Sequence, residues 1–180
     1  MKRATTLSAA ALFCTALVQA QQPPSAAAVL DQAKVQATQG HRVILAIFHA
    51  SWCGWCKKFD SFLDSADVKP IAEKYFVRAY FTIQEHEESK ALNTPGGDEL
   101  VATLGGPKDP GLPFFAFVDS QGAPIVNSIG PDKAGNLSNI GHPAQPEEVD
   151  WFMAMLKKAV PAMTPEEAAT FEKYLRDQKK

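Results

Sequence analysis

Two cysteines three positions apart, Cys53 and Cys56, are the residues of this sequence best suited to chemistry. They lie in HASWCGWCKKF, residues 49–59, where an apolar run ends and a helix-like pattern begins. Neighbouring thiols of this kind can exchange disulfides, bind a metal ion or form an inert cross-link. The rest of the chain has to separate these three possibilities.

The first 20 residues have the pattern of a cleaved secretory signal. Lys2 and Arg3 precede an apolar segment from Leu7 to Val18, and small residues lead to Ala20. The apolar segment is too short to span a bilayer. We therefore expect cleavage after Ala20, a periplasmic or secreted location, and no stable membrane insertion of the product.

Cleavage there would leave Cys53 and Cys56 as the only thiols in residues 21–180, because Cys14 is removed. A chain of 160 residues can bury one core without a disulfide framework, so we expect a single domain and a cysteine pair that is not structural. It carries 16 basic and 20 acidic residues, a net charge of −4, with no basic block. This charge pattern gives no reason to expect nucleic acid or an anionic membrane as a partner.

The hydrophobic pattern predicts an α/β arrangement around the cysteine pair. Continuous apolar runs indicate buried strands, and apolar residues at three- and four-residue spacing indicate helices. We expect a loose polar connection up to about residue 98 and a loop at 130–145. Together the predicted elements indicate a central mixed four-stranded sheet flanked by helices. The predicted elements are helices at 26–39, from 53, at 65–75 and at 98–104, strands at 42–48, 76–83, 113–119 and 123–129, and two helices opening at Pro146 and Thr164.

The predicted helix start makes the two sulfurs unequal. Cys53 falls at the helix N-terminus with its side chain outward, where unpaired backbone N–H groups and the helix dipole favour the thiolate. Cys56 falls one turn later on the apolar face with Phe59. We therefore predict that Cys53 is the nucleophile and that Cys56 resolves the mixed disulfide.

Two segments resemble the thioredoxin family. FHASWCGWCK, residues 48–57, is similar to the active-site segment of that family, and GLPFFAFVDSQG, residues 111–122, is similar to its cis-proline segment. The likeness covers residues 42–129 and the next helix loosely, while the last helix is an addition. It implies a thioredoxin-like fold and thiol-disulfide exchange with protein substrates, with the cysteine disulfide as the redox group and no other cofactor. It also implies that Pro113 is cis beside the cysteines and that the Leu112 backbone pairs with substrate peptide.

The sequence departs from the family pattern in two places. Ile47 occupies the position, six residues before the first cysteine, where thioredoxins carry a buried aspartate that helps deprotonate the resolving thiol. Trp55 stands between the cysteines and brings no charge to stabilise a thiolate, which favours reduction or exchange over strong oxidation. Trp52 and Trp55 are candidates for substrate contact, although Trp52 could equally support the loop from within.

The main alternative is a binding module that carries copper or zinc on the same cysteines. His49, four residues before Cys53, could complete a Cys2His set, but no fourth ligand is evident. We expect the segment around His86, with its neighbouring glutamates, to be a solvated loop, and we assign no role to His142. The sequence does not identify the substrate or the membrane or soluble electron donor that an oxidoreductase needs.

Overall fold

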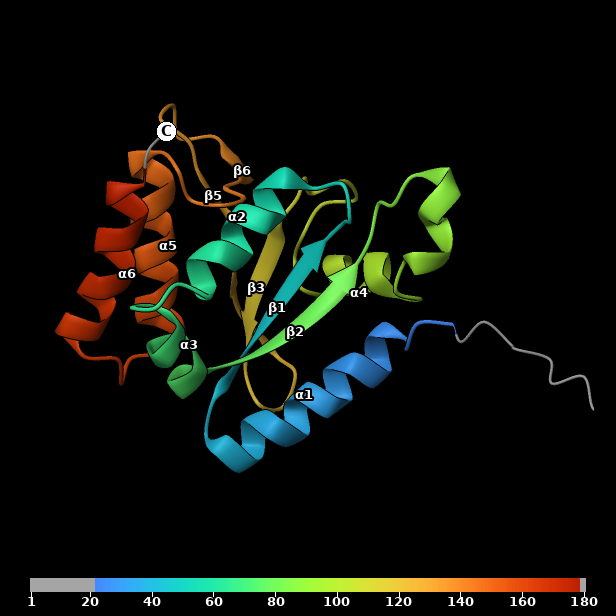
Figure 1. Ribbon diagram of the computed structural model, residues 1–180, viewed down its shortest axis with the longest axis horizontal. Helices are drawn as coiled ribbons and strands as arrows, with labels where there is room; N and C mark the ends of the chain where they lie inside the picture. The colour runs from blue at the N-terminus through green and yellow to red at the C-terminus, as the bar shows by residue number, and fades with distance from the viewer. Residues whose placement is uncertain (1–21, 179–180) are drawn as a thin grey trace, which may run out of the picture.

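The computed structural model describes residues 22–178 (Figure 1), so the expected signal segment lies outside the described residues. The helices are α1 (Ala26–Gly40), α2 (Gly54–Leu63), α3 (Lys69–Tyr75), α4 (Gly97–Thr103), α5 (Pro146–Ala159) and α6 (Pro165–Asp177), with a 3-10 helix η1 (Glu87–Leu92). The strands are β1 (Val43–His49), β2 (Phe76–Thr82), β3 (Phe114–Val118), β4 (Pro124–Asn127), β5 (Ile129–Pro131) and β6 (Leu137–Asn139).

Four strands form the central sheet in the order β2-β1-β3-β4. The β1 and β2 strands are parallel, whereas β1–β3 and β3–β4 are antiparallel. A parallel pair needs a long crossover, and α2 and α3 supply it between β1 and β2. The prediction of a mixed four-stranded sheet flanked by helices is confirmed.

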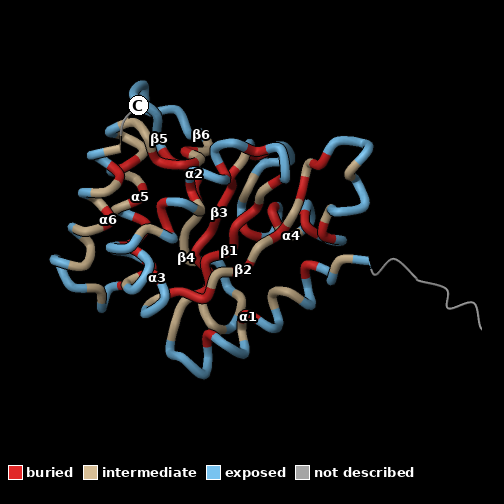
Figure 2. The backbone as a smooth tube through the Cα atoms, viewed as in Figure 1, coloured by how far each residue is buried: buried red, intermediate tan, exposed pale blue. Residues whose placement is uncertain are grey.

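The β1 strand is buried because helices cover both faces of the sheet, as Figure 2 shows by its red central strands. Leu45 and Ile47 point to the face where they join a core with residues of α2, α5 and α6. Ile44 and Phe48 point to the other face, where they pack with α1. This two-sided burial explains the continuous apolar run, since no position of the strand needs a polar side chain.

Glu167 links the start of the added helix α6 to α3, while Phe171 and Leu175 of α6 are buried in the core. The Glu167 carboxylate accepts hydrogen bonds from Lys74 Nζ at 2.7 Å and Tyr75 Oη at 2.6 Å, and from the backbone N–H of Thr164 at 3.0 Å. The hydroxyl of Thr164 accepts from the backbone N–H of Glu167, which completes a capping box. These bonds join α3 to the start of α6.

Two predicted loops contain structure. The connection expected to be loose up to about residue 98 holds η1, and β5 and β6, at and within the loop expected at 130–145, form a separate two-stranded antiparallel sheet. These two expectations are therefore wrong, whereas the short helix expected at 98–104 is confirmed by α4. Within residues 22–178, no helix combines the length and hydropathy needed to cross a membrane.

Candidate active site

The cysteine pair lies at the N-terminus of α2 and is joined in a disulfide. Cys53 is the N-cap residue, its Sγ lies 2.05 Å from Cys56 Sγ, and the same Sγ accepts a hydrogen bond from the backbone N–H of Cys56 at 3.0 Å. The helix starts here because the cap sulfur occupies the position that a Ser or Asp oxygen usually takes. The expected placement of Cys53 at the helix start is confirmed.

The expected outward side chain of Cys53 is wrong for this oxidised form. Both cysteines expose only 3% of their surface. The bond to Cys56 directs the Cys53 sulfur back toward the helix, and Ala50 and Leu112 pack against the pair. The two sulfurs therefore do not differ in exposure. They differ in position along α2, because Cys53 is the N-cap residue and Cys56 lies in the first turn.

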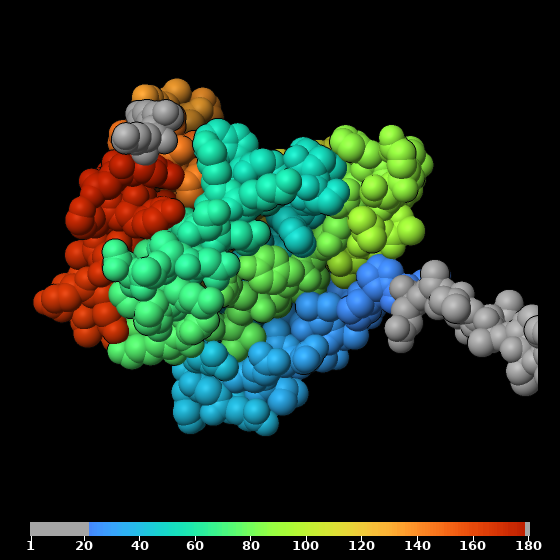
Figure 3. Space-filling view, viewed as in Figure 1, coloured from blue at the N-terminus to red at the C-terminus, as the bar shows by residue number. Residues whose placement is uncertain are grey.

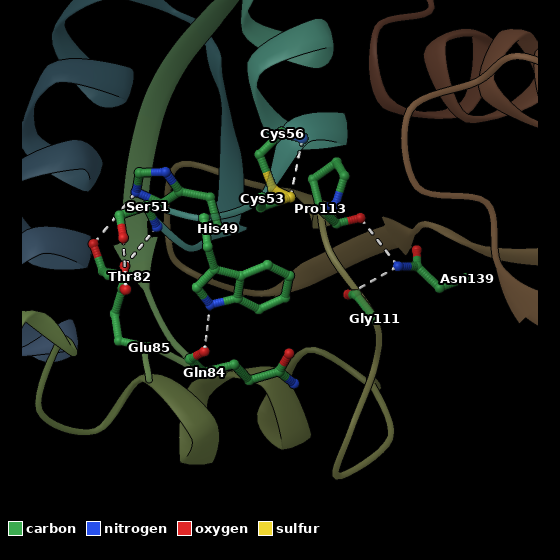
Figure 4. Close-up of a disulfide and its surroundings, with 11 residues drawn as sticks. His49, Ser51, Cys53, Cys56, Thr82, Gln84, Glu85, Gly111, Pro113 and Asn139 are labelled. Carbon is green, nitrogen blue, oxygen red and sulfur yellow. Dashed lines mark hydrogen bonds between the residues drawn. A yellow bond between two sulfur atoms is a disulfide. The ribbon is translucent and has the colours of Figure 1, made fainter. Parts of the chain in front are cut away.

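The cis-proline segment lies beside the disulfide (Figure 4), and the Leu112–Pro113 peptide bond is cis, as the resemblance implies. The Asn139 side chain holds this segment, because its Nδ2 donates hydrogen bonds to the carbonyls of Gly111 at 3.1 Å and Pro113 at 3.0 Å. Asn139 is itself fixed by the hydroxyl of Ser128, which donates to its Oδ1 at 2.7 Å. Within the described chain, no hydrogen bond uses the backbone N–H or C=O of Leu112.

Trp52 precedes the pair and Trp55 stands between the two cysteines, and both are about half exposed, at 47% and 51%. Trp52 donates its Nε1–H to the carbonyl of Gln84 at 2.8 Å and stacks on His86 at 5.3 Å between ring centroids. Trp55 lies under Lys58 Nζ, 4.1 Å from the ring centroid. Both rings are at the surface, so Trp52 supports the loop from outside and is not a core residue. Figure 3 shows the teal start of α2 between the orange β5–β6 region and the lime-green segment after β2.

The segment after β2 contains a site residue that the sequence analysis misjudged. Glu85, expected in a solvated loop, is 8% exposed. Its Oε1 accepts from the backbone N–H of Ser51 at 2.5 Å and its Oε2 accepts from the Ser51 hydroxyl at 2.7 Å (Figure 4). The sequence separation of 34 explains why no local pattern predicted this contact.

His142, for which no role was expected, is buried beside Trp55. Gln178 donates its amide N–H to the carbonyl of Pro143, so its Oε1 accepts from His142 Nε2, 2.6 Å away. That bond leaves Nδ1 as a buried acceptor without a hydrogen-bond partner. Burial lowers the pKa of His142, so the ring is neutral at pH 7. A pocket of about 250 Å³ lies between Trp55, Leu112 and His142.

Ile47 and His49 both lie in β1, where Ile47 is buried in the core and His49 is the last residue of the strand. Ile47 is 1% exposed and packs in the same cluster as Phe59 of α2. His49 Nε2 lies 3.4 Å from Thr82 Oγ1, at the end of β1. Among residues 22–178, no group of three or more His, Cys, Asp or Glu side chains is arranged to hold a metal ion.

A mixed sheet, a C-x-x-C disulfide at the start of the first crossover helix and a cis proline beside it together define a class of thiol-disulfide proteins. The chain belongs to the thioredoxin-like family, whose sequence pattern matches residues 25–120. No curated protein matches the chain.

Three solved structures are similar to this chain over most of its length. A disulphide isomerase from Xylella fastidiosa Temecula1 is 16% identical, covers 93% of this chain and 100% of its own, and has a TM-score of 0.49. A DsbH oxidoreductase is 24% identical with 87% and 96% covered and a TM-score of 0.43. A thioredoxin from Thermus thermophilus is 20% identical with 73% and 88% covered and a TM-score of 0.42. The family, and not a particular relative, is what these comparisons establish.

Proposed function

We propose that this protein is a secreted or periplasmic thiol-disulfide oxidoreductase that acts on protein substrates, mainly as a reductant. The observation that carries the proposal is a disulfide whose Cys53 caps a helix beside the Leu112–Pro113 segment. In this proposal residues 21–180 are the working domain, and the export of that domain is supported by the N-terminal sequence pattern.

The proposed reaction uses both sulfurs in turn. A donor of unidentified nature first passes two electrons to the disulfide and leaves two thiols. The Cys53 thiolate then attacks one sulfur of a substrate disulfide, which forms a mixed disulfide and expels the first substrate thiolate. The Cys56 thiolate attacks Cys53 Sγ, expels the second substrate thiolate and restores the disulfide. Two electrons have passed to the substrate, and its thiolates take up the protons.

The structure offers a binding edge for the substrate in this scheme. The unpaired N–H and C=O of Leu112 can pair with an extended peptide, because backbone groups left without partners seek hydrogen bonds. Trp52 and Trp55 supply half-exposed aromatic surface next to the cysteines in the sequence. Aromatic side chains of this kind contribute contact area at low entropic cost.

Reduction of insulin tests the proposal. The reduced protein is expected to precipitate the insulin B chain without added metal, Cys53→Ser is expected to abolish this activity, and Cys56→Ser is expected to accumulate a mixed disulfide. Stoichiometric uptake of copper or zinc with no turnover would instead support the metal-carrying alternative. Mass spectrometry of the exported protein is expected to find Gln21 as the first residue; retention of residues 1–20 would refute the signal assignment.

A further inference from the structure

The loop that carries the nucleophile is held from outside by three consecutive residues after β2. The carbonyl of Gln84 accepts from the Trp52 indole, the Glu85 carboxylate accepts twice from Ser51, and the His86 ring stacks on Trp52. Each contact falls on one of the two residues that immediately precede Cys53. Figure 4 shows Ser51, Gln84 and Glu85 grouped beside the disulfide.

The segment that makes these contacts, residues 84–86, includes an unfavourable backbone conformation. Gln84 has φ of 58°, in the left-handed region that non-glycine residues enter at a cost. The backbone N–H of Glu85 donates to Asn93 Oδ1 at 3.1 Å, which fixes the segment from behind. The fold thus maintains an unfavourable backbone angle at the point where the Glu85 carboxylate turns toward Ser51.

We propose that Glu85 is a positioning residue that keeps Cys53 at the helix cap. The proposal rests on the proposed function in one respect only, that Cys53 is the nucleophile. The two bonds from Ser51 fix its backbone and its side chain together, so the chain direction just before Trp52 and Cys53 is held at two points. The Cys53 sulfur gains from the helix N-terminus only while it remains aligned with the free N–H groups, because this effect falls off within the first turn.

Loss of the Glu85 contacts should therefore change the reactivity of the Cys53 thiol, although Glu85 acts on it only through Ser51. In Glu85→Ala, the Ser51–Trp52 backbone loses its two side-chain bonds, and the Cys53 sulfur spends less time aligned with the helix. We expect the pKa of the Cys53 thiol to rise by about one unit and the alkylation rate at pH 7 to fall about tenfold.

Glu85→Gln is the matched variant that separates position from charge. Its amide oxygen can accept from the Ser51 N–H, and its amide nitrogen can donate to the Ser51 hydroxyl, which then becomes the acceptor. Both contacts survive while the negative charge is removed. We expect the alkylation rate to stay within about twofold of the parent, whereas Ser51→Ala, which removes only the hydroxyl contact, should shift the rate in the same direction as Glu85→Ala but less.

The measurement is the pH dependence of iodoacetamide alkylation of Cys53, made in a Cys56→Ser background so that one thiol reacts. An unchanged Cys53 titration in folded Glu85→Ala would overturn the proposal, and so would a Glu85→Gln variant as impaired as Glu85→Ala. If Glu85→Ala does not fold, an unchanged titration in Ser51→Ala would overturn it. Alkylation needs no substrate protein, so a chain that fails to reduce insulin would refute the proposed function and leave this test intact.

Discussion

Replacing Ile47 with Asp tests whether the resolving cysteine lacks a base. Ile47 lies in β1 between Tyr80 and Phe115 in the strand register and points to the face that α2 covers. Cys56 is buried on α2, and burial of a thiol in apolar surroundings raises its pKa. A carboxylate at position 47 would stand where the family pattern places its acid, and its own burial would raise its pKa toward neutrality, which suits a base.

The substitution carries a stability cost that can be bounded. Loss of a fully buried Ile side chain costs about 1.5–3 kcal/mol. A buried polar group without a full set of partners adds about 1–3 kcal/mol. Since small domains unfold at about 5–15 kcal/mol, the variant should fold with a lowered melting temperature. Ile47→Asn is the matched control, because it pays a similar packing and polar cost and cannot act as a base.

Stopped-flow decay of the mixed disulfide between pH 6 and 9 measures the resolving step. A thiol with a pKa of about 8.5 is only about 3% thiolate at pH 7, so the parent rate should rise close to tenfold per pH unit up to that value. Ile47→Asp should be faster than the parent near pH 7, and Ile47→Asn should not. A parent rate that is flat with pH, or a folded Asp variant no faster than Asn, would show that another group already removes the proton.

The remaining predictions concern the cap, the proline segment and the last helix. In the reduced protein, Cys53 should titrate below about 8.5 and be alkylated well before Cys56, because the cap position favours its thiolate; equal rates would contradict that assignment. In Asn139→Asp the side chain can no longer donate to the two carbonyls of the cis-proline segment. KM for a disulfide peptide should therefore rise roughly tenfold while the alkylation rate of Cys53 is unchanged. An unchanged KM would show that Asn139 does not position this segment for substrate. Hydrogen bonds from Lys74 and a neighbouring tyrosine lower the pKa of Glu167 to about 2, so its stabilisation is complete above about 4.5 and is lost as pH falls toward 2. The free energy of unfolding, measured with urea, should therefore fall less steeply with decreasing pH in Glu167→Gln than in the parent. Parallel plots of unfolding free energy against pH for the two proteins would refute this prediction.

The main elements could be predicted because their signals are local. A buried strand such as β1 is a continuous apolar run, and the opening of α6 carries a complete capping box in four residues. The β5–β6 sheet could not be predicted, since its strands have three residues each and show no alternation. Its turn depends on Asp132, whose Oδ1 accepts from the N–H groups of Ala134 and Asn136. In the sequence, this segment has the same polar, turn-rich pattern as an ordinary loop.

The cysteines could be located from the sequence, but the residues that hold their surroundings could not. Glu85 stands in an acidic run whose local pattern favours solvent, and the two donors of Ser51, in the turn after β1, make burial of its carboxylate favourable. Asn139 likewise gains its role from carbonyls that lie 26 and 28 residues earlier. Contacts of this kind are set by the tertiary fold, which spacing along the chain does not encode.

Ile47 and Glu85 together bear on how protons move at this site. The acid that the family pattern places beneath the cysteines is absent, and the carboxylate that the fold does bring to the loop has both oxygens engaged by Ser51. With no acid at position 47, we expect Cys56 to lose its proton to solvent, and the resolving step, not the attack by Cys53, should then carry the pH dependence of turnover.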